Sequence, residues 1–166
     1  MSYHFDILEK QEALLRFSKF DHDVAWNLGC AMVQRAKEQG IVIAVSIRMA
    51  NGSIVFQHLP EGTNALNERW MRRKFNTVSL MESSSLRATF TVEAKGESLQ
   101  VHTLPEEDYA LCGGGFPVRI QGSEAIAGVV LASNLYHIVD HEFIVDCLRD
   151  FLSCPEAPAY PFTLPE

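Results

Sequence analysis

The sequence contains no apolar run that approaches the roughly 18 residues needed to cross a membrane, so no membrane partner is expected. The segment from Met1 to Asp6 places no basic residues before an apolar core, as a secretory signal peptide would. The 4 cysteines lie far apart and form no CxxC pair, which argues against a zinc site or a disulfide framework. Free thiols are typical of a reducing compartment, and we therefore expect a cytoplasmic protein.

Positive charge is also scarce. The chain has 14 Lys and Arg against 21 Asp and Glu, which gives a net charge of −7. A surplus of negative charge repels phosphate backbones and anionic lipid surfaces. Nucleic acid and anionic membranes are therefore not expected as partners.

Signatures of catalysis are missing as well. The segment Gly113-Gly114-Gly115 continues into a strand-like segment, not into Gly-Lys-Ser/Thr and a helix, so it is neither a P-loop nor a dinucleotide-binding fingerprint. The segment Ser83-Ser84-Ser85 lacks the Gly-x-Ser-x-Gly pattern of a nucleophile elbow. We do not expect an enzyme, and an enzyme of unknown reaction that uses His141 or Cys112 is kept as an alternative.

Length and composition favour one domain. The chain has 166 residues, of which 47% are hydrophobic, enough for one ordinary core. We expect residues 1–152 to form this domain, with a helical arm over residues 5–17. The tail, residues 153–166, contains Pro155, Pro158, Pro161 and Pro165 and cannot be helical. It is either disordered or an extended arm that crosses another subunit.

Hydrophobic periodicity and turn signals predict the elements of the domain. Helices are expected at residues 5–17, 21–39, 66–81, 83–95 and 137–152, and strands at 41–48, 53–58, 116–121 and 125–132. Asp21 or Asp23 offers an N-cap and Gly40 a C-cap for the second helix, and Asp140 is an alternative start for the last helix. Asn51-Gly52 predicts a two-residue type I′ hairpin turn, and residues 122–124 predict a second hairpin. Two hairpins separated by helices indicate an α+β fold, a mostly antiparallel β-sheet flanked by helices.

The glycine block Gly113, Gly114 and Gly115 is the first candidate for a binding site. Successive glycines leave their backbone N–H groups uncovered, and such groups can form a nest that binds an anion. The alternative is structural, because glycine also permits close backbone packing at the start of a strand, here at Pro117.

A cluster of cations on one predicted helix is the second candidate. Arg69, Arg72, Arg73 and Lys74 fall within one short segment. Arginine clamps carboxylates and phosphates through paired hydrogen bonds, so the cluster would suit an organic anion. The alternatives are a solvated face or ion pairs across a subunit interface.

Two histidines form the third candidate. His137 and His141 are four residues apart and share a face if one helix carries both. His141 could ligate haem iron or act as an acid or base. The alternative is that Asp140 caps the helix and His141 sits in its first turn. We expect no metal site.

Several segments together resemble a known family. They are residues 59–63 (Leu-Pro-Glu-Gly-Thr), 70–74 (Trp-Met-Arg-Arg-Lys), 83–86 (Ser-Ser-Ser-Leu), 113–117 (Gly-Gly-Gly-Phe-Pro) and 140–142 (Asp-His-Glu). Over residues 20–152 this combination is similar to the haem-binding, or "haem-degrading domain", superfamily, and within it to the UPF0303 family. The resemblance implies a profilin-like fold, a symmetric homo-oligomer, and haem or another small ligand as a partner.

The sequence therefore predicts a cytoplasmic homo-oligomer that binds a small ligand, either haem or another planar or anionic molecule. The residues expected to bind it are Arg72, Arg73, Lys74, Gly113, Gly114, Gly115 and His141. A scaffold that binds protein partners without chemistry is the main alternative. The apolar residues of the N-terminal arm and of the tail, among them Tyr160, are expected to contact a neighbouring subunit.

Overall fold

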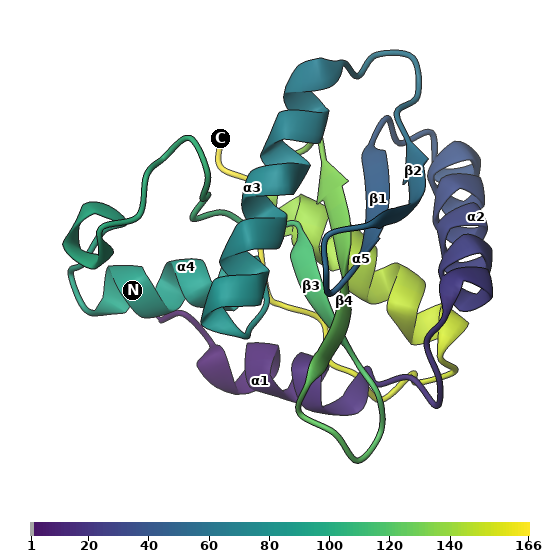
Figure 1. Cartoon of the computed structure of the whole chain (residues 1–166). Helices are drawn as coiled ribbons and strands as arrows, with labels where there is room; N and C mark the ends of the chain where they lie inside the picture. Colours follow the sequence, from purple (N-terminus) through teal and green to yellow (C-terminus); the bar gives the residue numbers. More distant parts are fainter. Residues whose placement is uncertain (1) are drawn as a thin grey trace.

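The computed structural model describes residues 2–166. Its elements, in chain order, are α1 (Phe5–Leu14), α2 (His22–Gln39), β1 (Ala44–Met49), β2 (Ile54–His58), α3 (Ala65–Met81), α4 (Ser85–Ala94), a short 3₁₀ turn (Gln100–His102), β3 (Gly115–Arg119), β4 (Ile126–Ser133) and α5 (His137–Phe151) (Figure 1). Within residues 2–166, no helix is both long and apolar enough to span a bilayer.

The strands form one sheet in the order β2-β1-β4-β3, and every neighbouring pair is antiparallel. Helices α2 and α5 cover one face of the sheet, and α3 covers the other (Figure 1). This arrangement confirms the predicted α+β class, with a mostly antiparallel sheet flanked by helices.

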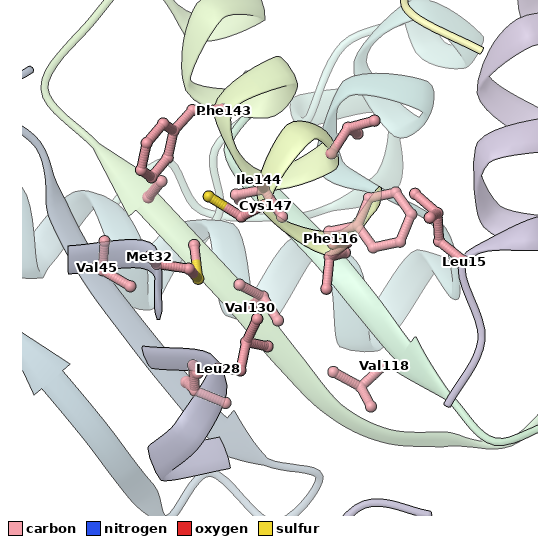
Figure 2. Close-up of a cluster of buried hydrophobic side chains, with 14 of the residues drawn as sticks. Leu15, Leu28, Met32, Val45, Phe116, Val118, Val130, Phe143, Ile144 and Cys147 are labelled. Carbon is pink, nitrogen blue, oxygen red and sulfur yellow. The ribbon is translucent and has the colours of Figure 1, made fainter. Parts of the chain in front are cut away.

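Alternation along the strands explains why the sheet is buried on both faces. In β4, Val130 belongs to the larger core cluster with Met32 of α2 and Ile144 of α5 (Figure 2). Its neighbour Val129 points to the opposite face and belongs to a second cluster with Met71 of α3. Successive side chains in a strand point to opposite faces, so an unbroken apolar run in β4 is what a sheet between two helical layers requires.

Polar caps fix the predicted starts of two helices. The Asp21 carboxylate accepts a hydrogen bond from Val24 N at 2.8 Å and caps α2, which ends at Gly40 with a φ of 65°. The Ser84 hydroxyl accepts from Arg87 N at 3.2 Å and caps α4. Each cap is a local interaction, because the capping side chain and the N–H group that it accepts from lie only three residues apart.

The first hairpin differs from its prediction in the turn. Gly52 N donates to Met49 O at 2.8 Å, and Met49 N donates to Ser53 O at 2.9 Å. Only Gly52, with a φ of 91°, has a positive φ, whereas a type I′ turn needs one at Asn51 as well. The loop therefore has three residues, Ala50 to Gly52, which is the type I turn with a glycine bulge. The two-residue turn is wrong, and the antiparallel pairing of β1 and β2 is confirmed.

One helix end differs from its prediction and another matches it. Helix α1 ends at Leu14, because Phe17 instead pairs with Ile120 beside β3 as an isolated parallel bridge. Helix α5 begins at His137, as predicted, and the alternative start at Asp140 is wrong. The Asp140 carboxylate reaches back from the first turn and accepts a hydrogen bond from Leu135 N at 2.9 Å. It therefore stabilises the start of the helix from inside.

The chain termini pack on their own domain. Tyr160 of the tail is buried with Leu8 of α1 and with Phe90 of α4, and its hydroxyl donates to Tyr3 O at 3.0 Å. Gln11 of α1 donates to Pro158 O at 2.9 Å. We expected Tyr160 and the apolar residues of the N-terminal arm to contact a neighbouring subunit, but Tyr160 and Leu8 are already buried within one chain.

Candidate functional site

The glycine block is a packing device in this structure. Gly113 N donates to His137 Nδ1 at 3.0 Å, and Gly115 N donates to Ser85 Oγ at 2.9 Å. A Cβ on Gly114 would lie 2.5 Å from both Ala132 O and Lys74 Nζ. Two of the three N–H groups are thus paired within the protein. The structural alternative, a close approach of backbone at the start of β3, describes the block better than an open anion nest.

Arg72 and Arg73 hold a loop against α3. Arg72 donates to Glu107 O at 3.1 Å and lies 3.4 Å from the Asp108 carboxylate. Arg73 donates through Nε to Tyr109 O at 3.2 Å, and its guanidinium lies 4.3 Å from the centre of the Trp70 ring. The two arginines do not converge with Lys74 on one anion-binding position.

Lys74 behaves differently from the two arginines because it points into the protein. Its ammonium donates to Ala132 O at 2.8 Å and to Asp140 Oδ2 at 3.2 Å, and both side chains of this ion pair are only 3% exposed. Burial raises the pKa of Asp140 above its ordinary value, while Lys74 and the hydrogen bond from Leu135 N act in the opposite direction. The pair links α3 to α5.

The Lys74–Asp140 pair lies on a pocket of about 430 Å³, which we call the α3–α5 pocket. It is formed by the first turns of α3, the end of β4, the start of α5 and the residue before the glycine block. Its lining residues are Gly62, Asn64, Leu66, Asn67, Trp70, Lys74, Cys112, Ser133, Asn134, Leu135, His137 and Asp140. Leu66, Trp70 and Leu135 supply an apolar wall.

His137 lines both this pocket and a neighbouring one beside Tyr160, and it carries a hydrogen-bond donor. Its Nδ1 accepts the N–H of Gly113 and must therefore carry a lone pair. Burial lowers the pKa of His137, and the nearby Lys74 lowers it further, so the ring is neutral at pH 7. In a neutral imidazole with a lone pair on Nδ1, the proton is on Nε2. The side chain thus offers an N–H group.

Cys112 lines the same pocket but is not an activated nucleophile. Burial raises the pKa of its thiol; Lys74 and Arg73 lower it and Asp140 raises it. A thiol with a raised pKa is protonated at pH 7, and only the thiolate is a strong nucleophile or metal ligand. This argues against the alternative of an enzyme that attacks through Cys112.

His141 does not line the α3–α5 pocket. The ring is fully buried, and Nε2 lies 2.8 Å from Gln11 Oε1, so it donates to the amide that joins α1 to α5. Burial lowers the pKa of His141 to about 3. Although His137 and His141 share α5, they have different partners, and residues 2–166 contain no group of three or more His, Cys, Asp or Glu placed to hold a metal ion.

The structure therefore brings Lys74 together with residues that the sequence did not assign to the site. Trp70 and Asp140 belonged to segments that carried the family resemblance, and His137 was noted for its spacing. Asn67 gave no signal, because its contact with Ser133 joins positions far apart in the sequence. Of the predicted binding residues, only Lys74 lines the pocket.

Comparison with known proteins identifies the family. Residues 20–149 match the family described as haem degrading protein HbpS-like. A UPF0303 protein of Yersinia enterocolitica is 36% identical over 148 residues, which cover 89% of this chain and 87% of the relative. A UPF0303 protein of Pseudomonas entomophila is 38% identical over 147 residues, which cover 88% of this chain and 81% of the relative.

Solved structures share the fold at lower identity. The Ybr137w protein superposes with a TM-score of 0.83 at 23% identity, over 90% of this chain and 88% of that one. HbpS gives a TM-score of 0.65 at 15% identity, over 82% and 92%. A PduOC:heme complex gives 0.65 at 18% identity, over 80% and 94%. Fold and sequence agree: the chain belongs to the HbpS-like haem degrading protein family and, within it, to the UPF0303 proteins.

Proposed function

We propose that this protein binds a small ligand in the α3–α5 pocket. The observation that carries the proposal is the buried Lys74–Asp140 pair on the wall of a cavity that also has an apolar side. Taking two charges out of water is unfavourable, and replacing such a pair by apolar residues is often neutral or stabilising. Buried, paired charges in a cleft with a few convergent polar groups are typical of binding sites.

The two tryptophans allow a direct test. The chain has 2 Trp residues, Trp70 in the pocket and Trp26 on α2, which is 60% exposed. A Trp26→Phe variant keeps only the pocket fluorophore, and Trp70→Phe keeps only the remote one. Native mass spectrometry of freshly purified protein first identifies any retained small molecule. Titration of that molecule should change the fluorescence of Trp26→Phe and leave that of Trp70→Phe unchanged.

Haem is a second candidate ligand, and the comparisons favour it. The family is described as haem degrading, and one neighbour of the same fold was solved with heme. Iron ligation in the α3–α5 pocket would displace existing interactions. Binding through His137 Nε2 would move its proton to Nδ1 and break the hydrogen bond from Gly113 N, the Cys112 thiol would have to lose its proton, and Lys74 is paired with Asp140. A haem titration followed by visible absorption, repeated with His137→Ala, tests this candidate.

We further propose that the protein forms a homo-oligomer. Its support is the free edge strand β2 and the exposed apolar residues Trp26, Ile54 and Leu66, because unpaired strand edges and apolar groups commonly mark interfaces. Light scattering should give a mass that is a multiple of 18.6 kDa. A monomer at micromolar concentration would contradict this.

A scaffold that binds protein partners is the competing function. A scaffold of this kind would leave the α3–α5 pocket without a small ligand.

A cytoplasmic location is also proposed. Its support is that Cys30, Cys112, Cys147 and Cys154 are all free in the structure, as is usual where thiols stay reduced. Cell fractionation with an antibody to the untagged protein tests it.

A further inference from the structure

The polar groups of the α3–α5 pocket are unevenly divided between donors and acceptors. His137 offers Nε2–H, which has no partner among the described residues. The ammonium of Lys74 carries three N–H groups, of which Ala132 O and Asp140 Oδ2 take two. Asn67 Nδ2 makes only long contacts of 3.3–3.4 Å to Ser133 and Asn134. The Nε2–H group of His137 and one N–H group of Lys74 are therefore left without a hydrogen-bond acceptor within residues 2–166.

The only carboxylate of the pocket already accepts two hydrogen bonds. Asp140 is the only carboxylate among the lining residues; its Oδ2 accepts from Lys74 and its Oδ1 from Leu135 N. Asn134 Oδ1 and Ser133 Oγ have the same long contacts with Asn67 Nδ2, so they are as weakly engaged as that donor. The strongest unpaired groups of the pocket are therefore the N–H groups of His137 and Lys74, which suit a ligand that accepts hydrogen bonds.

Electrostatics at the pocket also suits an acceptor that carries negative charge. The Lys74 ammonium offsets the single lining carboxylate, and the N-terminal turns of α3 and α5 both open on the cavity. The N-terminus of a helix carries partial positive charge on its unpaired N–H groups. Two such termini add partial positive charge beside the neutral ion pair, and Glu68 in the first turn of α3 offsets part of it.

Given that the pocket binds a small ligand, as proposed above, we propose that this ligand is a small organic carboxylate. Its carboxylate oxygens accept hydrogen bonds from His137 Nε2–H and from the third N–H of Lys74. Its apolar part packs against Trp70 and Leu135. The volume of about 430 Å³ is ample for such an acid. Coordination of a metal or haem iron through Nε2 would require this proton to move to Nδ1 and would break the hydrogen bond from Gly113 N.

Two substitutions of His137 separate the pocket donor from the structural acceptor. In His137→Asn, the amide oxygen takes the place of Nδ1 and can accept from Gly113 N, but the donor toward the pocket is lost. In His137→Gln, the amide nitrogen takes the place of Nε2, so the donor is kept and the bond from Gly113 is lost. The probes are acetate, propionate and benzoate, each with its amide as the neutral match, and haem, all titrated by calorimetry.

We expect at least one acid to bind more tightly than its amide. His137→Asn should weaken that binding by roughly tenfold to a hundredfold, the range for a hydrogen bond to a charged group. His137→Gln should stay close to wild type in affinity and lose thermal stability. Nitrogen-15 NMR of the wild-type ring should find the proton on Nε2.

Other results overturn the inference in distinguishable ways. Equal binding of acids and amides removes the preference for a carboxylate but keeps the pocket as a binding site. A proton on Nδ1 removes the proposed donor at Nε2, and a haem absorption band that disappears in His137→Asn shows that the ring coordinates iron. If an unrelated retained molecule changes the fluorescence of Trp70 while no acid binds, only the ligand class is wrong. If no probe and no retained molecule binds, the proposed function fails as well.

Discussion

Gly114 and Lys74 are in direct contact, because a Cβ on Gly114 would lie 2.5 Å from Lys74 Nζ. The glycine block and the cationic helix, which the sequence presents as two separate candidates for anion binding, are therefore one packing unit. The absence of a side chain at Gly114 makes room for the ammonium that pairs with Asp140. Gly114 thus leaves space for a charged group that lines the α3–α5 pocket.

Substitution of Gly114 by Ala should therefore destabilise the fold strongly. The φ of Gly114 is 113°, which strains any residue with a side chain, and the added Cβ would also meet Ala132 O at 2.5 Å. Strain and overpacking each contribute about 1–3 kcal/mol. The control is Gly122→Ala, where φ is 83° and nothing lies within 4 Å, so a loss of only about 1 kcal/mol is expected. Urea unfolding measures both variants, and equal losses would show that the contact with Lys74 does not matter.

The buried ion pair should be strongly coupled. Lys74→Met leaves the Asp140 carboxylate buried without its cation, which usually destabilises by about 3–5 kcal/mol. In the double variant Lys74→Met/Asp140→Asn the uncompensated charge is gone, so the loss should be clearly smaller than the sum of the two single losses. Chemical denaturation of the four proteins gives the coupling free energy. Additive losses would mean that the pair contributes nothing as a pair.

What the sequence predicted correctly depends on short-range rules. The predicted cap at Asp21 of α2 lies three residues from its partner, and the composition of residues 41–48 and 125–132 predicted the strands β1 and β4 near their observed places. The position of the turn at Gly52 was predicted correctly, but its type was not. A two-residue loop and a three-residue loop join strands of the same composition, so the sequence does not distinguish them.

The candidate site could not be predicted in the same way. Lys74 and Asp140 are 66 positions apart in the sequence. They meet only because α3 and α5 both pack against β4. A run of four cations on one helix gave no indication that Lys74 is buried while Arg72 and Arg73 hold the loop at Tyr109. Helix periodicity places a residue on a face, but it does not say which partner that face meets.

The turn after β1 should tolerate asparagine better than valine. Gly52 has a φ of 91°, a region that β-branched residues resist and that asparagine adopts more readily. Gly52→Val should lower the free energy of unfolding by about 1 kcal/mol or more, and Gly52→Asn by clearly less. Thermal unfolding of the two variants checks the order. If the valine variant were as stable as wild type, the glycine bulge would not be needed to close the hairpin.

His141 should make the fold sensitive to acid. Its pKa is lowered from 6.5 to about 3 because the ring is fully buried, with His137 adding to the effect. Between these values the unfolded chain binds a proton that the folded chain does not, so the free energy of unfolding falls as the pH falls from about 6.5 to about 3. At about 1.4 kcal/mol for each pH unit, the whole loss of unfolding free energy across this range is on the order of 5 kcal/mol.

The variant His141→Gln isolates this contribution. Its amide nitrogen can still donate to Gln11 Oε1, but it does not titrate. Asp140 and Glu142, whose pKa values are raised by burial, act in the opposite sense in both proteins, so the difference between wild type and variant reports on His141. Urea midpoints at pH 7, 5.5 and 4 should converge as the pH falls. Parallel curves would mean that His141 binds its proton equally well in the folded and the unfolded state.

The tail should stabilise its own chain. Tyr160 is 8% exposed and packs with Leu8 and Phe90, whereas Leu164 at the end of the same tail is 62% exposed. Truncating a large buried side chain usually destabilises by about 3–5 kcal/mol, and less where the site is near the surface. Tyr160→Ala should therefore lower the melting temperature by several degrees, and Leu164→Ala should leave it unchanged. Light scattering on Tyr160→Ala separates this role from assembly: an unchanged mass with a lower melting temperature is expected, and a change of mass at an unchanged melting temperature would place Tyr160 at a subunit interface instead.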